Sequence, residues 1–128
     1  MTYLLDTHVL LWLLTDPDQL GKKAREVIEN SENQLLWSAA SFWEITVKIS
    51  LGKLTLEPDW VTTLELEKKR LRIRDLPILW QHCQAQLKLP WHHRDPFDRL
   101  LICQALSEQA TLITRDQSIR RYKVKTLW

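Results

Sequence analysis

Four acidic residues stand where strand-forming and helix-forming segments of the sequence are expected to meet. Asp6 ends a short apolar run, and Asp116 follows a later apolar run by one residue. Glu44 and Asp98 each lie in the first turn of an expected helix. In a parallel sheet these positions lie beyond the carboxyl ends of the strands, which is where such sheets bind ligands. The sequence therefore predicts that four carboxylates from distant segments lie at one edge of one sheet.

Carboxylates crowded in this way favour the binding of a metal ion. Unpaired carboxylates repel and raise one another's pKa values, and a divalent cation removes that repulsion. Because the cluster contains no His or Cys, its oxygen atoms select hard ions such as Mg²⁺ or Mn²⁺ over zinc. A metal ion in an open cleft, near basic side chains, can activate water and neutralise the charge that develops on a phosphate. The predicted chemistry is the hydrolysis of phosphodiester bonds.

Each of the four acids also has an ordinary structural role open to it. Glu44 could complete a capping box with the amide of Ser41, and Asp116 could cap the helical turn that follows it. Asp98 could favour the positive end of its helix, and Asp6 could form an Asx turn. Separate caps need not converge, whereas a metal site requires convergence, so we favour the metal site.

A fifth acid, Asp95, stands three residues before Asp98, and both would share one face of a helix. Asp95 precedes Pro96, which makes it a better N-cap than a metal ligand, and we expect Asp98 to be the ligand. Three hydroxyls near the strand ends could hydrogen-bond the ligating carboxylates, although a backbone hydrogen bond is their commoner role: Thr7, Ser38 and Thr114.

Basic residues near these acids could contact a nucleic acid. His92, His93 and Arg94 form a loop before the helix of Asp98, and Trp91 offers a face on which a base could stack. Two further clusters could follow a phosphate backbone, with a solvated helix face as an equal alternative for each: residues 68–74 and 115–125.

Strand-like and helix-like segments alternate along the whole chain. Apolar runs predict strands at residues 2–6, 34–39, 71–75, 110–114 and 124–128. Helices are expected at residues 8–15, 21–31, 42–51, 60–70, 77–87 and 96–109, with one helical turn at 117–121. Gly52 is placed to end a helix in the left-handed conformation, and Pro77 to begin one. The alternation predicts a mostly parallel sheet covered by helices on both faces.

Size and composition exclude several classes of protein. The 128 residues fit one domain, residues 1–128. The only glycines, Gly21 and Gly52, cannot form a glycine-rich phosphate loop or a G-x-S-x-G elbow, so no nucleotide cofactor is expected. The longest apolar run, Val9 to Leu14, is far shorter than the roughly 20 residues that span a membrane. No signal peptide is visible, and we expect a cytoplasmic protein without membrane contact.

Four segments carry a family resemblance: Leu4 to Trp12 (LLDTHVLLW), Ser41 to Lys48 (SFWEITVK), His93 to Ala105 (HRDPFDRLLICQA) and Thr111 to Asp116 (TLITRD). In this order and at these spacings they resemble the PIN-domain ribonucleases. The resemblance is closer still to the VapC toxins of VapBC type II toxin–antitoxin systems. It spans the whole chain, and the four segments together are far more specific than any one of them.

The resemblance implies a three-layer α/β/α sandwich and an endoribonuclease that depends on Mg²⁺ or Mn²⁺. It also implies a homodimer and inhibition by a VapB-like antitoxin whose C-terminal segment enters the cleft. Carried over residue by residue, the four acids of the family fall on Asp6, Glu44, Asp98 and Asp116. Asp6 and Asp98 would be the principal metal ligands, and Asp116 would complete the site. Glu44 would position the attacking water or a second ion.

Two other functions remain to be weighed against RNA hydrolysis. A non-catalytic PIN-like module could use the same cleft to bind RNA or a protein, but a pure binder need not retain four mutually repelling carboxylates. A phosphoaspartate enzyme or receiver could use Asp6 as its nucleophile or phosphoacceptor. Such sites pair that acid with a second one for Mg²⁺, whereas Asp6 is followed by Thr7.

Overall fold

A five-stranded parallel sheet forms the centre of the molecule. The computed structural model describes all residues from Met1 to Trp128. The strands are β1 (Thr2–Leu5), β2 (Gln34–Ser38), β3 (Ile73–Leu76), β4 (Thr111–Ile113) and β5 (Thr126–Leu127). They lie in the order β3-β2-β1-β4-β5, and every neighbouring pair is parallel. The winding therefore changes direction between β1 and β4, which is the point where open parallel sheets bind ligands.

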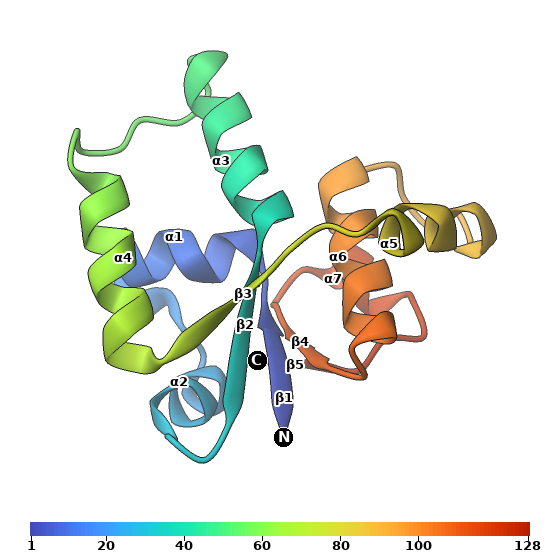
Figure 1. Ribbon diagram of the computed structural model, residues 1–128, viewed down its shortest axis with the longest axis horizontal. Helices are drawn as coiled ribbons and strands as arrows, with labels where there is room; N and C mark the ends of the chain where they lie inside the picture. The colour runs from blue at the N-terminus through green and yellow to red at the C-terminus, as the bar shows by residue number, and fades with distance from the viewer.

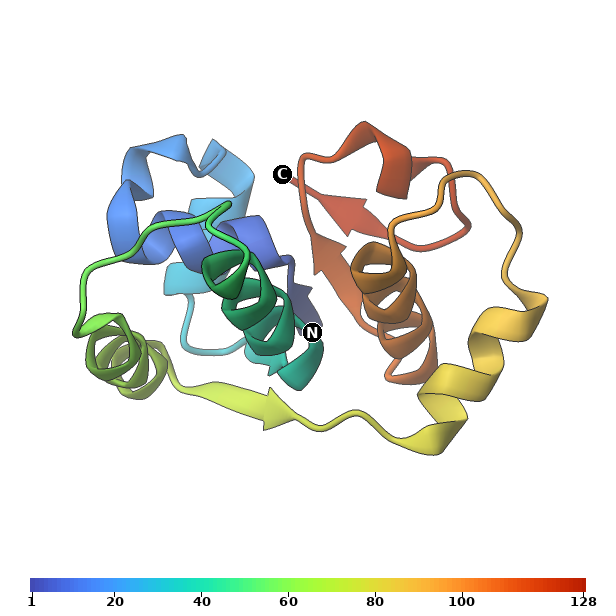
Figure 2. The same ribbon diagram turned by 90° about the horizontal axis from the view of Figure 1, so that it is seen from above.

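Helices cover both faces of this sheet, and Figure 1 shows them on either side of the strands. On one side lie α1 (Thr7–Thr15), α2 (Lys22–Glu29) and α4 (Trp60–Leu71). On the other lie α5 (Trp80–Ala85), α6 (Pro96–Ser107) and α7 (Gln117–Arg120). The helix α3 (Ala39–Ser50) rises from the end of β2, and Figure 2 shows it between α4 and α6. Single 3₁₀ turns occupy Pro17–Gln19 and Gln86–Lys88.

Two separate apolar cores confirm the predicted three layers. Side chains of a strand point alternately to the two faces of its sheet. Accordingly Leu4 packs with Leu101 and Ile102 of α6, whereas its neighbour Leu5 packs with Val9 and Leu10 of α1. All six of these residues are at most 2% exposed. No helix of the chain is both long enough and apolar enough to cross a membrane.

Most of the predicted elements are present with shifted ends, and two start positions are wrong. The helix α3 begins at Ala39, three residues early, because Ser38 caps it by accepting a hydrogen bond from the Ala40 amide (2.9 Å). Gly52 follows this helix with φ +72°, as predicted. Pro77 does not begin a helix, and α5 starts only at Trp80. The residues between β3 and α5 are in neither helix nor strand, and the Pro77 carbonyl accepts from the side chain of Gln104 (3.2 Å) instead of from a helix amide.

Candidate active site

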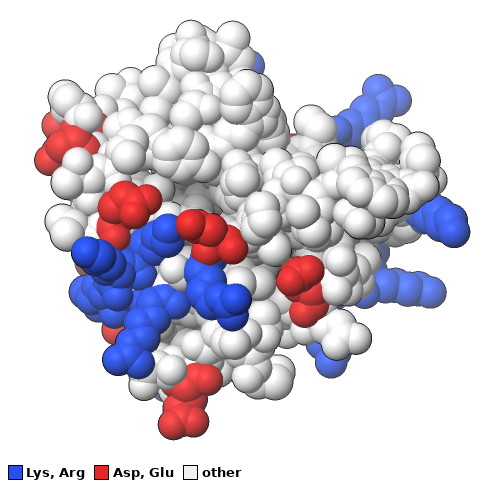
Figure 3. All heavy atoms as spheres, viewed as in Figure 1, with Lys and Arg blue, Asp and Glu red and all other residues white.

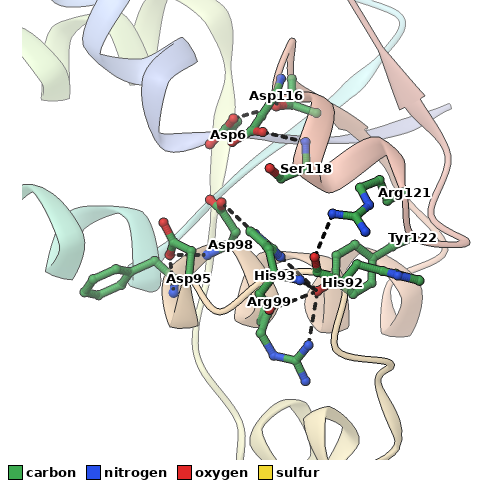
Figure 4. Close-up of polar contacts among 12 residues, drawn as sticks. Asp6, His92, His93, Asp95, Asp98, Arg99, Asp116, Ser118, Arg121 and Tyr122 are labelled. Atoms are coloured by element: carbon green, nitrogen blue, oxygen red, sulfur yellow. Dashed lines mark hydrogen bonds and ion pairs between the residues drawn. The ribbon is translucent and has the colours of Figure 1, made fainter.

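Asp6 and Asp116 lie side by side at the carboxyl edge of the sheet, beyond the neighbouring strands β1 and β4 (Figure 4). Thr114 links them, because its hydroxyl donates to Oδ2 of Asp6 (2.6 Å) and accepts from the backbone N–H of Asp116 (3.0 Å). The two acids line one cavity of about 280 Å³ together with His8 and Arg115. Asp116 also caps α7 by accepting from Ser118 N (2.8 Å), as one of the structural alternatives predicts. The Asx-turn alternative for Asp6 receives no support, since its side chain makes no cap hydrogen bond.

Asp98 faces the same space from α6. Figure 4 shows its carboxylate pointing toward that of Asp6. It is 8% exposed, and its Oδ2 lies 3.1 Å from Nε2 of His93. Asp95 has the separate role expected of it, since it caps α6 by accepting from the amides of Phe97 (2.9 Å) and Asp98 (3.1 Å).

Glu44 enters from α3 and is buried with its own partners. Its carboxylate accepts from Thr7 Oγ1 (2.8 Å) and forms an ion pair with Lys48 one turn later. The capping box with Ser41 does not form, because α3 begins at Ala39 and Ser41 lies inside the helix. The i,i+4 spacing of Glu44 and Lys48 was the sequence signal that could have revealed this ion pair.

Burial and the neighbouring carboxylates raise the pKa values of two of the acids. Burial, followed by the nearby carboxylates of Asp95, Asp6, Asp116 and Glu44, raises the pKa of Asp98 to about 8. Burial also raises the pKa of Asp6, and the hydrogen bond from Thr114 opposes this effect. Such shifts indicate carboxylates that lack a compensating positive charge.

This set of acids fits a divalent cation in donor type and in charge, although it does not enclose one. The oxygen donors are those that Mg²⁺ and Mn²⁺ prefer. No three His, Cys, Asp or Glu side chains of the chain stand close enough together to hold an ion. The structure therefore brings Asp6, Asp98 and Asp116 to one space, with Glu44 behind them on α3, and leaves their carboxylates apart.

Two of the three predicted hydroxyl partners contact acids of the site. Thr114 bonds to Asp6 and Thr7 bonds to Glu44, as the sequence suggested. Ser38 instead caps α3 and donates to Gln104. No sequence pattern pointed to Tyr122, whose hydroxyl lies 2.9 Å from Nδ1 of His93 and so belongs to the surroundings of Asp98.

The basic clusters differ in their distance from the acids. Arg115 lines the cavity of Asp6 and Asp116 and is exposed. The basic cluster of residues 68–74 lies at the end of α4 and the start of β3, at the amino edge of the sheet, opposite the edge that carries the acids. There Lys68 pairs with Asp75 (2.7 Å) and Arg70 with Glu67 (2.9 Å). Figure 3 shows these basic side chains interspersed with acids, which fits the alternative of a solvated face.

An apolar cavity of about 660 Å³ lies apart from the acids, between α3, α4 and the end of β3. Leu64, Phe42 and Trp43 are among the residues that line it. Trp43 is 63% exposed. The buried face of α3 carries Ala40, Ser41, Glu44 and Ile45, so Trp43 points away from the sheet.

Solved structures share this fold over nearly the whole chain. The VapBC2 complex of Rickettsia felis, bound to a DNA fragment from its promoter, contains a chain with a TM-score of 0.78 and 16% identity, and the match covers 99% of this chain and 98% of that one. A chain of VapBC-1 from nontypeable Haemophilus influenzae has a TM-score of 0.65 and 22% identity over 99% and 97% of the two chains. At these identities the likeness establishes the fold.

Sequence comparison gives the family. The ribonuclease VapC22 of Mycobacterium tuberculosis (strain ATCC 25618 / H37Rv) is 26% identical over 123 residues, which are 95% of this chain and 92% of that protein. The family model of the PIN domain matches residues 3–125, a range that contains all four candidate acids. The resemblance found in the sequence is confirmed, and the chain belongs to the PIN-domain family.

Proposed function

We propose that this protein is an endoribonuclease that depends on a divalent metal ion and acts as the toxin of a toxin–antitoxin pair. The observation that carries the proposal is that Asp6, Asp98 and Asp116, from three distant segments, face one space where the winding of the sheet changes direction. Membership of the PIN-domain family supports it, as does a relative that is named a ribonuclease.

Asp6 and Asp98 would be the principal ligands of Mg²⁺ or Mn²⁺, Asp116 would complete the site, and Glu44 would position the attacking water or a second ion. When bound, the cation would activate water and neutralise the charge that develops on the phosphate. The raised pKa of Asp98 supports this assignment, because a nearby divalent charge relieves the repulsion that raises it.

Other residues of the chain hold the carboxylates in position or would bind the substrate. Thr114 holds Asp6 and Asp116 beside one another, and Thr7 and Lys48 fix the carboxylate of Glu44. Arg115 stands exposed at the same cavity as Asp6, where it would bind the phosphate backbone of RNA. The threonine hydroxyls would orient the carboxylates, and Arg115 would attract the RNA toward those carboxylates.

The partners would be RNA, a VapB-like antitoxin and a second copy of the chain, in the cytoplasm. Two solved structures that share this fold are VapBC2 of Rickettsia felis and VapBC-1 of Haemophilus influenzae, which supports an antitoxin partner. Large apolar side chains on the surface also favour protein contacts, among them Trp43 (63% exposed) and Trp80 (69% exposed). In Figure 3, the surface that α3 and α5 present to the viewer carries almost no charged side chains.

Cleavage of labelled total RNA by the purified chain tests the proposal. We expect discrete fragments with Mg²⁺ or Mn²⁺, none with EDTA, and none from Asp98→Asn. A matched control is Asp59→Asn, because Asp59 lies at the start of α4 and its side chain makes no cap hydrogen bond. Metal-independent RNA binding without cleavage, by a folded protein free of inhibitor, would favour the non-catalytic binding module instead.

A further inference from the structure

A row of hydrogen bonds connects a buried arginine to Asp98. Arg99, the next residue in α6, is 2% exposed, and its Nη1 donates to the hydroxyl of Tyr122 (3.1 Å). That hydroxyl lies 2.9 Å from Nδ1 of His93, and Nε2 of His93 lies 3.1 Å from Oδ2 of Asp98. Figure 4 shows these side chains converging from α6, the loop before it and the turn after α7.

The direction of each hydrogen bond follows from groups that can only donate. A guanidinium and a backbone N–H have no acceptor atom. The Tyr122 oxygen therefore accepts from Arg99 Nη1 and from the backbone N–H of His93 (3.2 Å). Its own proton must point to an acceptor, and Nδ1 of His93 at 2.9 Å is nearer than the His93 carbonyl at 3.4 Å. Since Nδ1 accepts, a neutral His93 carries its proton on Nε2 and donates it to Asp98.

We propose that Arg99 and Tyr122 are positioning residues that fix His93 as the Nε2–H tautomer, and that His93 thereby holds the carboxylate of Asp98 in one orientation for metal binding. This inference rests on the proposed function, because it takes Asp98 as a metal ligand. Hydrogen-bonded side chains behind metal ligands commonly set the orientation and the affinity of those ligands. With Oδ2 bonded to His93, the other carboxylate oxygen of Asp98 has no side-chain partner in the protein.

Arg99 also fixes the loop from which His93 projects. Its guanidinium donates to the backbone carbonyls of Leu89 (3.2 Å) and Pro90 (2.8 Å), and it lies 3.6 Å from the centre of the Trp91 ring. It forms no ion pair with an acid, so its charge holds neutral oxygens in place and leaves the carboxylates of the site uncompensated. A guanidinium keeps its charge at every ordinary pH, which makes this support constant.

The variant Tyr122→Phe tests the inference with a single atom. It removes the hydroxyl and retains the ring, whose packing against His92 (4.7 Å between ring centres) and His93 (5.4 Å) should survive. The matched control is Tyr3→Phe, because Tyr3 is the chain's other tyrosine, is also a buried residue, and makes no hydrogen bond through its hydroxyl. Nitrogen-15 NMR of the metal-free protein should show His93 as the Nε2–H tautomer in wild type and Tyr3→Phe, and as mixed tautomers in Tyr122→Phe.

Metal affinity gives a second readout that needs no cleavage. Titration with Mn²⁺, followed by electron paramagnetic resonance, should show a dissociation constant about 10-fold higher for Tyr122→Phe than for wild type, the lower end of what outer contacts commonly contribute. His93→Ala should weaken Mn²⁺ binding by about 10- to 100-fold. His93→Gln should recover most of this loss, since its amide N–H₂ can replace the Nε2 donor.

The variant Asp98→Asn separates failure of this inference from failure of the proposed function. If Asp98→Asn loses Mn²⁺ binding while Tyr122→Phe keeps both the tautomer and the affinity of wild type, the positioning role is wrong and the metal site stands. If Asp98→Asn binds Mn²⁺ as wild type does, the proposed metal site is wrong, and the positioning role falls with it.

Discussion

Three acids of this site are held in place by the side chains of two threonines and a histidine. Thr114 orients Asp6, Thr7 orients Glu44, and His93 contacts Asp98. Each contact occupies one carboxylate oxygen and leaves the repulsion between the acids in place. Buried acids that repel one another lower the stability of the folded chain, and functional sites commonly carry such a burden.

Asp98→Asn should therefore stabilise the protein in EDTA while it removes metal binding. An acid whose pKa is raised in the folded state destabilises that state at every pH above its unfolded value, which is about 3.9, and the pKa of Asp98 is raised to about 8. We expect the melting temperature at pH 7.5 to rise by a few degrees, measured by calorimetry. Mn²⁺ should raise the melting temperature of wild type only, and an equal rise in the variant would contradict the assignment.

Thr114→Val should weaken both stability and cleavage. The change keeps the shape of the side chain and removes the hydroxyl that joins Asp6 to Asp116. The unpaired buried groups should cost about 1–3 kcal/mol of unfolding free energy, measured in urea. Cleavage should fall about 10- to 100-fold. Thr111→Val is the control, because Thr111 is also buried in β4 and its hydroxyl makes no hydrogen bond; equal losses in both variants would refute this role of Thr114.

At the scale of elements, helix beginnings carry the site. Three of the acids stand at or near the start of α1, α6 or α7, directly after strands or loops that reach the carboxyl edge of the sheet. In α6 and α7 the side-chain caps of Asp95 and Asp116 set where the helix starts, and so they set where its first side chains point. A shift of one residue in α6 would turn Asp98 away from Asp6.

Asp95→Ala should loosen the first turn of α6. Asp95 accepts hydrogen bonds from two backbone amides of that turn, one of them the amide of Asp98. Loss of such a cap typically costs about 1 kcal/mol of unfolding free energy. Asp59→Ala provides the comparison, because Asp59 stands at the same position of α4 without a side-chain cap hydrogen bond. If urea unfolding shows the same small change in both variants, the cap at α6 has no energetic role.

The carboxylate of Asp75 connects β3 to β2 and α4, and protonation at low pH should weaken this connection. Asp75 accepts from Trp37 of β2 and from Lys68 of α4. The hydrogen bond from Lys68, more than that from Trp37, lowers the pKa of Asp75. An acid with a lowered pKa stabilises the fold above its unfolded value near 3.9 and loses this effect as the pH falls through its folded pKa.

Asp75→Asn should therefore be less stable than wild type at pH 7, and the difference should shrink below about pH 4. Unfolding in urea across this pH range, followed by tryptophan fluorescence, measures the difference. A difference that stays constant with pH would assign the effect to packing.

The elements were largely predictable from the sequence, and their exact contacts were not. Apolar runs and caps are local signals, so Asp95 as N-cap and Gly52 as helix end were predicted correctly. The failure at Pro77 has a long-range cause, since Gln104 of α6 holds its carbonyl. His93 and Tyr122 are 29 residues apart in the sequence, and no local sequence pattern predicts their contact.

At the scale of the whole molecule, strand order creates the site. The strand β4 pairs with β1 on the side that β2 leaves free, so the carboxyl ends of β1 and β4 are neighbours. This pairing places Asp6 beside Asp116 and lets Thr114 bond to Asp6, which is 108 positions away in the sequence. Helical connections between parallel strands place helices on both faces of the sheet and bury two cores, which the alternation of segments predicted. The four acids were identified from the sequence as candidates, and their roles remain proposals.

The location of a bound ion tests the central claim most directly. Crystals grown without metal would be soaked in Mn²⁺, and anomalous diffraction would show where manganese binds. The account predicts a peak about 2 Å from carboxylate oxygens of both Asp6 and Asp98. Manganese bound elsewhere, or absent from these two acids at a concentration that supports RNA cleavage, would contradict it.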